Sequence, residues 1–206
     1  MGLEMYMGFV LASSLILIIP GPTIILVVSQ AITHGKRAVV PLAAGVVTGD
    51  FTAMTLSLLG LGSLLSVSAE LFNILKWLGA LYLIYLGIRL WISAPTKVEI
   101  ESFPEQGTDR SLFRSSFIVT ALNPKSITFF IAFFPQFVGS SGSIRQLLLL
   151  GLTFLTLAGV NALLYGVFAG QFNELLQKQS TRRWLNRGGG SALIGAGVVT
   201  AGLKQG

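Results

Sequence analysis

The feature that most limits how this chain can fold is a series of long apolar stretches. A helix needs about 20 consecutive apolar residues to cross a bilayer core of roughly 30 Å. Six stretches meet or approach that length, and the sixth is short and rich in glycine. They cover residues 6–32, 38–61, 71–92, 112–138, 147–172 and 188–203. Because helices satisfy their own backbone hydrogen bonds in lipid, the sequence predicts an all-α membrane protein with six transmembrane helices.

The composition supports this class and excludes several others. Of the 206 residues, 52% are apolar and 11% are charged, whereas a soluble domain is about 25% charged. The net charge of +6 would indicate nucleic acid as the partner of a soluble protein. In a membrane protein charged loops explain it, so no nucleic acid is expected. The chain has no cysteine and one histidine, His34, which excludes disulfides and a metal site built from Cys or His. No cofactor is expected.

The distribution of basic residues predicts an orientation. Ten of the 14 Lys and Arg residues follow the first, third and fifth stretches, whereas three lie on the other side. Short loops rich in Lys and Arg stay in the cytoplasm, so we expect these three loops to be cytoplasmic and both termini to lie outside. His34 lies beside Lys36 and Arg37 in the first of these loops, where we expect it to be solvated.

The longest polar stretch, residues 94–111, divides the predicted spans into two groups of three. We interpret residues 1–206 as a single integral membrane domain, with halves at residues 1–93 and 112–206 and a cytoplasmic linker between them. Each half has an odd number of spans, so the second half enters the membrane from the opposite side. If the halves are structural repeats, they are therefore inverted repeats.

Proline interrupts the first span of each half. Pro20-Gly21-Pro22 lies between apolar runs of the first span, and Asn123-Pro124 lies within the fourth. Proline removes a backbone donor and its ring clashes with the carbonyl group four residues earlier, so both helices should break. Broken helices at corresponding places in two halves are typical of a transporter binding site, because their ends have unpaired N–H and C=O groups. The alternative is a pair of structural proline kinks.

One acid and one base lie deep within the predicted spans. Asp50 and Lys125 are each about 11 residues from the same side of the membrane, roughly 16 Å at 1.5 Å per residue. An unpaired charge at such depth costs about 2.5–3.5 kcal/mol, so the two are a candidate ion pair or proton relay. The alternative is a pair that only fixes helix packing. Gly45 and Gly49 precede Asp50 in a pattern of small residues that lets helices approach closely.

Other polar and aromatic residues are weaker candidates. Asn161 is the most polar residue of the fifth span, and either contributes to the site or bonds to a neighbouring helix. Five phenylalanines crowd the fourth span, where they either pack, face lipid or line an apolar gate. They are Phe129, Phe130, Phe133, Phe134 and Phe137.

At these positions the sequence resembles the lysine exporter and homoserine/threonine exporter (LysE/RhtB) family. The matching motifs are Pro20-Gly21-Pro22, residues 45–50, residues 76–87 and Leu122-Asn123-Pro124-Lys125, in the family's order. The resemblance covers nearly the whole chain. It implies a small exporter of amino acids in the bacterial inner membrane, driven by the proton gradient. It also implies that seven residues fall on characteristic positions of the family: Pro20, Gly21, Pro22, Asp50, Asn123, Pro124 and Lys125.

The residues themselves agree with secondary transport and leave alternatives open. The chain has no ATP-binding motif, and Asp50 is the one acid well inside a span that could carry a coupling proton. Broken helices suit a zwitterionic amino acid, because N–H ends attract a carboxylate and C=O ends an ammonium group. A passive channel and an exporter of another small molecule or cation stay open. An intramembrane enzyme is disfavoured, because no His or Cys lies within a span and Asp50 has no second acid. The glycine-rich faces would permit a homodimer.

Overall fold

The computed structural model describes residues 2–65, 107–138 and 143–202, together with part of residues 74–92. All regular structure in this part of the chain is helical, which confirms the all-α class. The first half contains α1 (Leu3–Ile18), α2 (Pro22–His34), the short η1 (Lys36–Ala38) and α3 (Val39–Leu65). The second half contains α5 (Asp109–Ala121), α6 (Pro124–Thr128), η2 (Phe129–Phe133), η3 (Phe134–Phe137), α7 (Ile144–Val167), α8 (Ala169–Gln177) and α9 (Gln179–Gly202).

The predicted membrane spans are met by two single helices and two bent pairs among the described residues. Lys36–Gly60 and Ile144–Val167 are each long and apolar enough to cross a membrane. Two bent pairs of helices are long and apolar enough when each pair is taken as one span. They are Leu3–Ile18 with Pro22–His34, bent by 54°, and Asp109–Ala121 with Pro124–Phe137, bent by 43°. The breaks expected from the prolines are therefore present in both spans.

The remaining spans differ from the predicted ranges or lie outside what is described. The fifth helix ends at Val167, not at residue 172, because the chain turns at Phe168 and continues as α8. The sixth predicted span, residues 188–203, overlaps α9 as far as Gly202. The first turns of α9 carry Arg183 and Arg187, and α9 is not among the described helices that are long and apolar enough to cross a membrane. Half of the third predicted span, residues 71–92, lies outside the described residues. Six spans and the inverted repeat thus stay predictions.

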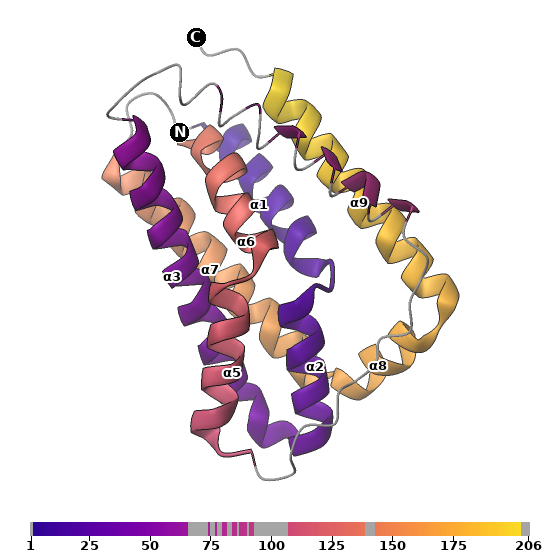
Figure 1. Ribbon diagram of the computed structural model, residues 1–206. Helices are drawn as coiled ribbons and strands as arrows, with labels where there is room; N and C mark the ends of the chain where they lie inside the picture. Colours follow the sequence, from indigo (N-terminus) through magenta and orange to yellow (C-terminus); the bar gives the residue numbers. More distant parts are fainter. Residues whose placement is uncertain are drawn as a thin grey trace.

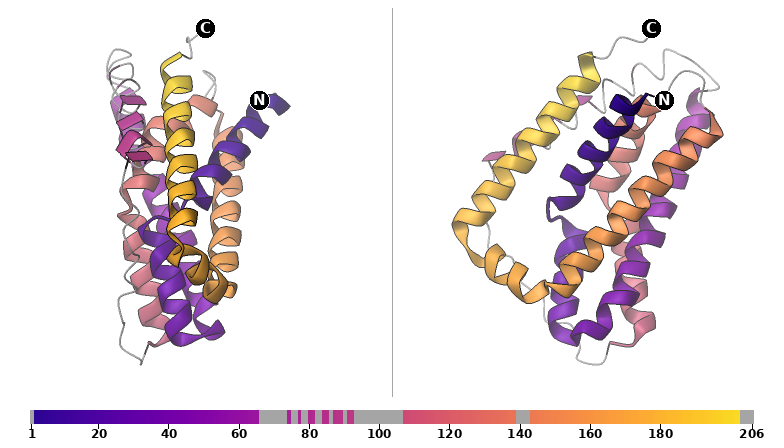
Figure 2. Two further views of the ribbon diagram at one scale, coloured as in Figure 1. Left: turned by 90° about the vertical axis from the view of Figure 1, so that its right-hand side faces the viewer. Right: turned by 180° about the vertical axis from the view of Figure 1, so that it is seen from behind.

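The helices run side by side along one long axis, and the two breaks lie near the middle of its length (Figures 1 and 2). α1 and α6 occupy one end of the bundle, and α2 and α5 the other. α3 packs along α5. α8 crosses the lower end and leads into α9, so the start of α1 and the end of α9 lie at the same end of the molecule. The two breaks are thus the centre of the described bundle.

Two glycines explain how closely α3 approaches α5. A Cβ atom added to Gly49 would lie 2.8 Å from the carbonyl oxygen of Phe117 and 2.8 Å from Cβ of Thr120. A Cβ atom on Gly45 would collide with the Ser116 hydroxyl group and would lie 2.5 Å from the Phe113 carbonyl oxygen. The sequence pattern of small residues is therefore a close-packing motif, and it places Gly49, the residue before Asp50, against the end of α5.

The buried core is divided into two clusters, one on each side of the breaks. The phenylalanine cluster is formed by α1, α3, α6 to η3, α7 and α9, and its phenylalanines are Phe9, Phe129, Phe130, Phe133, Phe134 and Phe154. The aliphatic cluster lies among α2, α3, α5 and α7 and contains Val27, Val28, Leu42, Val46, Leu112 and Ala162. Four of the five phenylalanines singled out in the fourth span are buried, so they pack inside the protein and do not face lipid.

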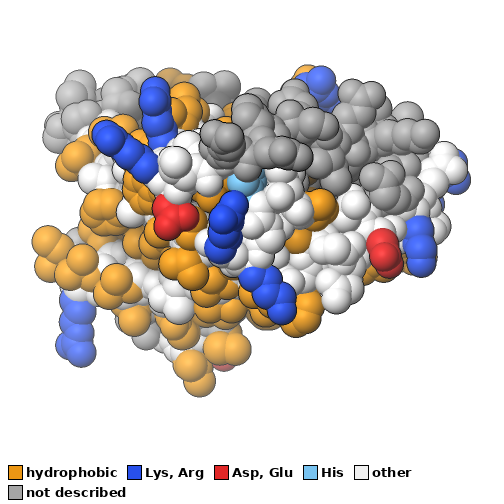
Figure 3. Space-filling model, turned by 90° about the horizontal axis from the view of Figure 1, so that it is seen from below, with side chains coloured by type: hydrophobic (Ala, Val, Ile, Leu, Met, Phe, Trp, Pro, Cys, Tyr) orange, Lys and Arg blue, Asp and Glu red, His pale blue; other side chains and the backbone are white. Residues whose placement is uncertain are grey.

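The lower end of the bundle is the basic one, but its histidine is not solvated. Lys and Arg side chains are spread over this end (Figure 3), and Lys36 and Arg37 are exposed there. His34 is only 7% exposed. Its Nδ1 contacts the Gln30 carbonyl oxygen at 3.2 Å, and Gly107 N–H donates to its Nε2 at 3.0 Å. The expectation of a solvated ring was wrong, because the chain returns at Gly107 and covers it.

Candidate functional site

The first break leaves carbonyl groups without their helical donors. In an α-helix the carbonyl oxygen of one residue accepts from the N–H group four residues later. The donors for Ile16 and Ile18 would be Pro20 and Pro22, and neither has an N–H group. α1 accordingly ends at Ile18 and α2 begins at Pro22, with the backbone extended at Ile19 and Gly21. The end of α1 therefore presents oxygens without helical donors at the middle of the bundle.

Side chains from two other helices satisfy these oxygens. We call the carbonyl groups of residues 16–19 the carbonyl end of α1. Lys125 Nζ, from α6, donates to the Ile16 oxygen at 2.9 Å and to the Ile19 oxygen at 2.8 Å. Asn161 Nδ2, from α7, donates to the Leu17 oxygen at 3.0 Å. Tyr165 OH, one turn further along α7, donates to the Ile18 oxygen at 2.6 Å. All four carbonyl groups thus have a side-chain donor.

The second break has a local cap. Asn123 precedes Pro124, the first residue of α6, and its Oδ1 accepts from the backbone N–H of Lys125 at 3.0 Å. This is the ordinary N-cap arrangement, which compensates one of the unpaired N–H groups of a helix start. Its Nδ2 donates to the Thr23 hydroxyl oxygen at 3.0 Å, and the Thr120 hydroxyl group donates to the same oxygen at 3.3 Å. Thr23 therefore joins the start of α2 to the second break.

Asp50 lies beside this junction, and one of its carboxyl oxygens is unpaired among the residues that the structure describes. Its side chain is 2% exposed. Ser126 hydrogen-bonds to it, and the charge of Lys125 acts on it. Among the described residues its Oδ1 has no hydrogen-bond partner. Lys125 and Asp50 therefore share one region of the bundle, but among the described residues the ammonium group donates to the carbonyl end of α1 and not to this carboxylate.

The structure brings the residues singled out from the sequence into one layer between the two core clusters. Lys125 passes beside Gly21, where an added Cβ atom would lie 3.4 Å from Nζ. Gly49 contributes by letting α3 pack closely on α5. Asn161 hydrogen-bonds to the neighbouring helix α1, which was one of the two roles expected for it. The prolines create the breaks that the other residues fill. They are Pro20 and Pro22 in the first half and Pro124 in the second.

Sequence reasoning missed four polar residues of this layer: Thr23, Thr120, Ser126 and Tyr165. Tyr165 could have been found, because it follows Asn161 by four residues and so shares its helix face. Thr23 and Ser126 each lie within two residues after a helix-starting proline, a position where a small polar side chain sits at a helix end. Thr120 gave no such signal, since its importance comes only from its contact with Thr23.

The layer combines groups of both charges. The C-terminal end of a helix carries a partial negative charge and the N-terminal end a partial positive charge. The carbonyl end of α1 is the first kind of end, and the starts of α2 and α6 are the second. With the Lys125 ammonium group and the Asp50 carboxyl group nearby, the layer has the complementary groups for a small zwitterion. Among the described residues, no three His, Cys, Asp or Glu side chains gather as metal ligands would.

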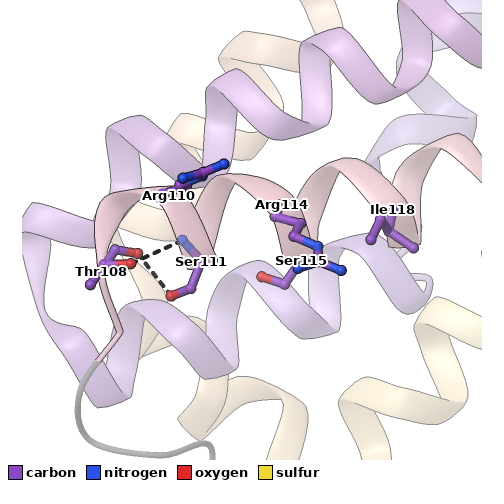
Figure 4. Close-up of a pocket in the computed structure, with 6 residues that line it drawn as sticks. All are labelled: Thr108, Arg110, Ser111, Arg114, Ser115 and Ile118. Carbon is purple, nitrogen blue, oxygen red and sulfur yellow. Dashed lines mark hydrogen bonds between the residues drawn. The ribbon is translucent and has the colours of Figure 1, made fainter.

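A separate hollow lies outside this layer, at the lower end of α5 (Figure 4). Its volume is about 640 Å³, and it is lined by Thr108, Arg110, Ser111, Arg114, Ser115 and Ile118. Thr108 caps α5 by accepting from Ser111 N–H at 3.2 Å, and Ser111 Oγ donates to the Thr108 carbonyl oxygen at 2.9 Å. No residue of the hollow belongs to the breaks, so it is a surface feature of the basic end.

Comparisons with known proteins support the resemblance inferred from the motifs. Over 206 residues covering the full length of both chains, the protein is 33% identical to a homoserine/homoserine lactone efflux protein of Salmonella typhimurium. It is 31% identical to a leucine efflux protein of Klebsiella pneumoniae over 137 residues, which are 66% of this chain and 65% of that one. An uncharacterized membrane protein of Vibrio cholerae is 28% identical over 99% of this chain.

No solved structure matches the chain. The model of the LysE type translocator family matches residues 14–202, which include both breaks, Asp50, Asn161 and Tyr165. With nearly the whole chain covered, the protein belongs to the LysE type translocator family.

Proposed function

We propose that this protein exports small zwitterionic amino acids, or close derivatives such as homoserine, from the cytoplasm by exchange for protons. The observation that carries the proposal is the polar layer at the two breaks, which lies between two apolar clusters. The relatives named as efflux proteins for homoserine and leucine support the substrate class. Homoserine and leucine each carry one ammonium group and one carboxylate group, and the homoserine lactone that the first relative's name also includes keeps the ammonium group.

The substrate would lie across the layer with each charged group at a complementary helix end. Its ammonium group would approach the carbonyl end of α1 and the Asp50 carboxylate. Its carboxylate would approach Lys125 and the N–H groups at the starts of α2 and α6, since half-helix N-termini favour anions. The phenylalanine cluster on one side and the aliphatic cluster on the other would close the path in alternation.

Asp50 is our candidate for the coupling proton. It is buried, one of its oxygens has no described partner, and Lys125 lies close enough for its charge to act on it. A carboxyl group in such a place can release its proton when an ammonium group arrives and regain it when that group leaves. Proton entry would thereby be linked to substrate exit.

The remaining parts of the proposal concern the membrane. We place the protein in the bacterial inner membrane with its basic end in the cytoplasm and both termini outside. Exposed apolar side chains such as Leu148 and Leu152, which are 60% and 64% exposed in the single chain, would face lipid. The glycine-rich faces would also allow a homodimer. Tags at the two termini should both react with a reagent that does not cross the membrane, and protection of either would contradict the orientation.

Transport in reconstituted liposomes tests the function directly. Liposomes with an acidic lumen should accumulate labelled L-homoserine or L-leucine above the external concentration, and a protonophore should abolish the accumulation. Equilibration without accumulation would instead indicate a passive channel. If the protein transports another small molecule or a cation but no amino acid, the proposed substrate class is wrong.

A further inference from the structure

The ammonium group of Lys125 occupies the very end of α1 that a substrate ammonium group would need. Two of its three N–H donors are used by the Ile16 and Ile19 oxygens, at 2.9 and 2.8 Å. These oxygens come from the segment in which Pro20 and Pro22 remove the helical donors. The other two oxygens of the carbonyl end are held by Asn161 and Tyr165, whose side chains are neutral. Among these four oxygens, only those of Ile16 and Ile19 bind a cation.

The chemistry of this contact is that of a primary ammonium ion and not of lysine in particular. A buried carbonyl pair at a helix C-terminus attracts any compact cation with N–H donors, and an amino acid's own ammonium group has the same donors and the same charge. The lysine is also not paired directly with the nearby acid, although a direct pair with Asp50 would be the simplest way to stabilise two buried charges.

We propose that Lys125 is a tethered surrogate for the substrate's amino group. The Ile16 and Ile19 carbonyl oxygens form an ammonium subsite that Lys125 fills when no substrate is bound and vacates when the substrate's ammonium group enters. This rests on the proposed function, since it names the subsite of the same binding layer. When displaced, the lysine is free to approach the substrate carboxylate or Asp50, so the buried carbonyl groups are never left without a donor.

The subsite should require a free ammonium group in the ligand. N-acetyl-L-homoserine keeps the carboxylate and the side chain of L-homoserine but replaces the cation with a neutral amide. It should therefore fail to displace Lys125. The proposal is that Lys125 and the substrate's ammonium group compete for one subsite. The test therefore has one part in a variant that lacks the lysine side chain and one part in the unaltered protein.

The first part uses Lys125→Ala in detergent. The atoms removed correspond to n-propylammonium, so this ion should raise the thermal unfolding midpoint of the variant saturably, by several degrees, as any ligand of the folded state does. Neutral 1-propanol should not. Lys125→Met, which fills the space with an apolar chain, and the unaltered protein should show no such effect. L-homoserine should compete with n-propylammonium, whereas N-acetyl-L-homoserine should not.

The second part needs no substitution, so it holds even if Lys125→Ala fails to fold. In the unaltered protein, reductive methylation of Lys125 is followed by mass spectrometry and expressed relative to that of the exposed Lys36 in the same sample, which corrects for formaldehyde consumed by the ligand's own amine. This ratio should rise several-fold with saturating L-homoserine and stay unchanged with N-acetyl-L-homoserine. Protection of Lys125 by L-homoserine, or no change, would overturn the proposal. So would additive stabilisation of Lys125→Ala by L-homoserine and n-propylammonium, because the two would then bind apart. Counterflow of labelled amino acids tests the proposed function separately, since it can succeed while the subsite fails.

Discussion

The two breaks are similar in sequence but are stabilised in different ways. At the first, the donors to the carbonyl end of α1 come from residues 106 to 147 positions away in the chain. At the second, Asn123 caps Lys125 N–H two residues later, and its own N–H donates to the Thr120 oxygen at 3.0 Å. The first joint is held by side chains of distant helices alone, whereas the second has a local cap in addition to its contact with Thr23. A joint closed by neighbours in sequence survives helix movements, whereas one closed by distant side chains opens when those helices separate.

The difference assigns separate tasks to the two breaks. The second is suited to be a fixed joint that positions Ser126 near Asp50, and the first is suited to change its partners during a transport cycle. Pro22 and Pro124 start the following helix in the same way, each at the first helical position. What differs is the residue before them, since glycine has no side chain with which to cap and asparagine does.

The largest expected effect lies at the second break. Asp50→Asn should abolish accumulation of amino acid driven by a pH gradient, because an amide cannot carry the coupling proton. The variant should fold, and exchange of substrate against substrate should continue, since the amide resembles the protonated acid. Measurements of uphill accumulation and of counterflow in the same liposomes separate the two activities.

The control for this variant is Asp109→Asn, which changes an exposed acid in the first turn of α5. It should leave both activities intact. Full uphill transport by Asp50→Asn would show that Asp50 only fixes helix packing. If Asp50→Asn instead fails to fold and the double variant with Lys125→Met recovers both folding and transport, the two residues are a structural pair.

The next effect compares the distant donor with the local cap. Lys125→Met leaves two carbonyl groups of α1 without a donor, and an unsatisfied buried group costs about 1–3 kcal/mol. Asn123→Ala removes an N-cap, which costs about 1 kcal/mol. We therefore expect a lower unfolding midpoint for Lys125→Met than for Asn123→Ala, and a larger loss of export.

The matched control is Lys36→Met, because Lys36 is exposed and lies at the basic end. Its unfolding midpoint should equal that of the unaltered protein. An Asn123→Ala variant that is less stable than Lys125→Met would reverse the comparison, since the local cap would then be the more important of the two joints.

The third effect concerns how α3 supports the second break. Gly49→Ala would bring a methyl group to 2.8 Å from the Phe117 carbonyl oxygen, and the backbone of α5 would have to move. Overpacking of this kind costs about 1–3 kcal/mol and should also shift Asp50 and reduce export. Gly60→Ala on the same helix is the control, because a Cβ atom added there meets no described atom within 4 Å. Equal stability of the two variants would show that α3 and α5 separate easily.

The sequence predicts the places of these joints better than their contacts. Proline acts on its own backbone, so both breaks can be located from Pro20, Pro22 and Pro124 alone. The depths of Asp50 and Lys125 follow from the fixed rise of a helix, and they do share one region. Which partner Lys125 bonds to could not be predicted, because a carboxylate and an unpaired carbonyl pair compete for it and only the tertiary arrangement decides.

Two other expectations failed for related reasons. His34 was expected to be solvated from its charged neighbours in sequence, yet Gly107, 73 positions away, covers it. The fifth span was expected to continue to residue 172 because the sequence stays partly apolar there, but the helix ends at Val167. In both cases the composition of the neighbouring sequence does not reveal the contact or the turn that decides the outcome.

The smallest effect tests whether the first break is a clamp or a binding surface. Tyr165→Phe removes the hydroxyl donor to the Ile18 oxygen but keeps the ring that packs on Phe172, with centroids 4.2 Å apart. Loss of one hydrogen bond should lower the free energy of unfolding by about 1 kcal/mol. If the donor only holds α1 in place, counterflow of L-homoserine should change less than twofold, because the opening of the break becomes slightly easier while the ammonium subsite at Ile16 and Ile19 stays intact.

The control is Tyr6→Phe, which removes a tyrosine hydroxyl group at a site away from the breaks, where it contacts Thr153 Oγ1 at 3.1 Å. A drop of tenfold or more in counterflow for Tyr165→Phe, with Tyr6→Phe unaffected, would instead mean that the hydroxyl group contacts the substrate, and the first break would then be a binding surface over all four of its carbonyl groups.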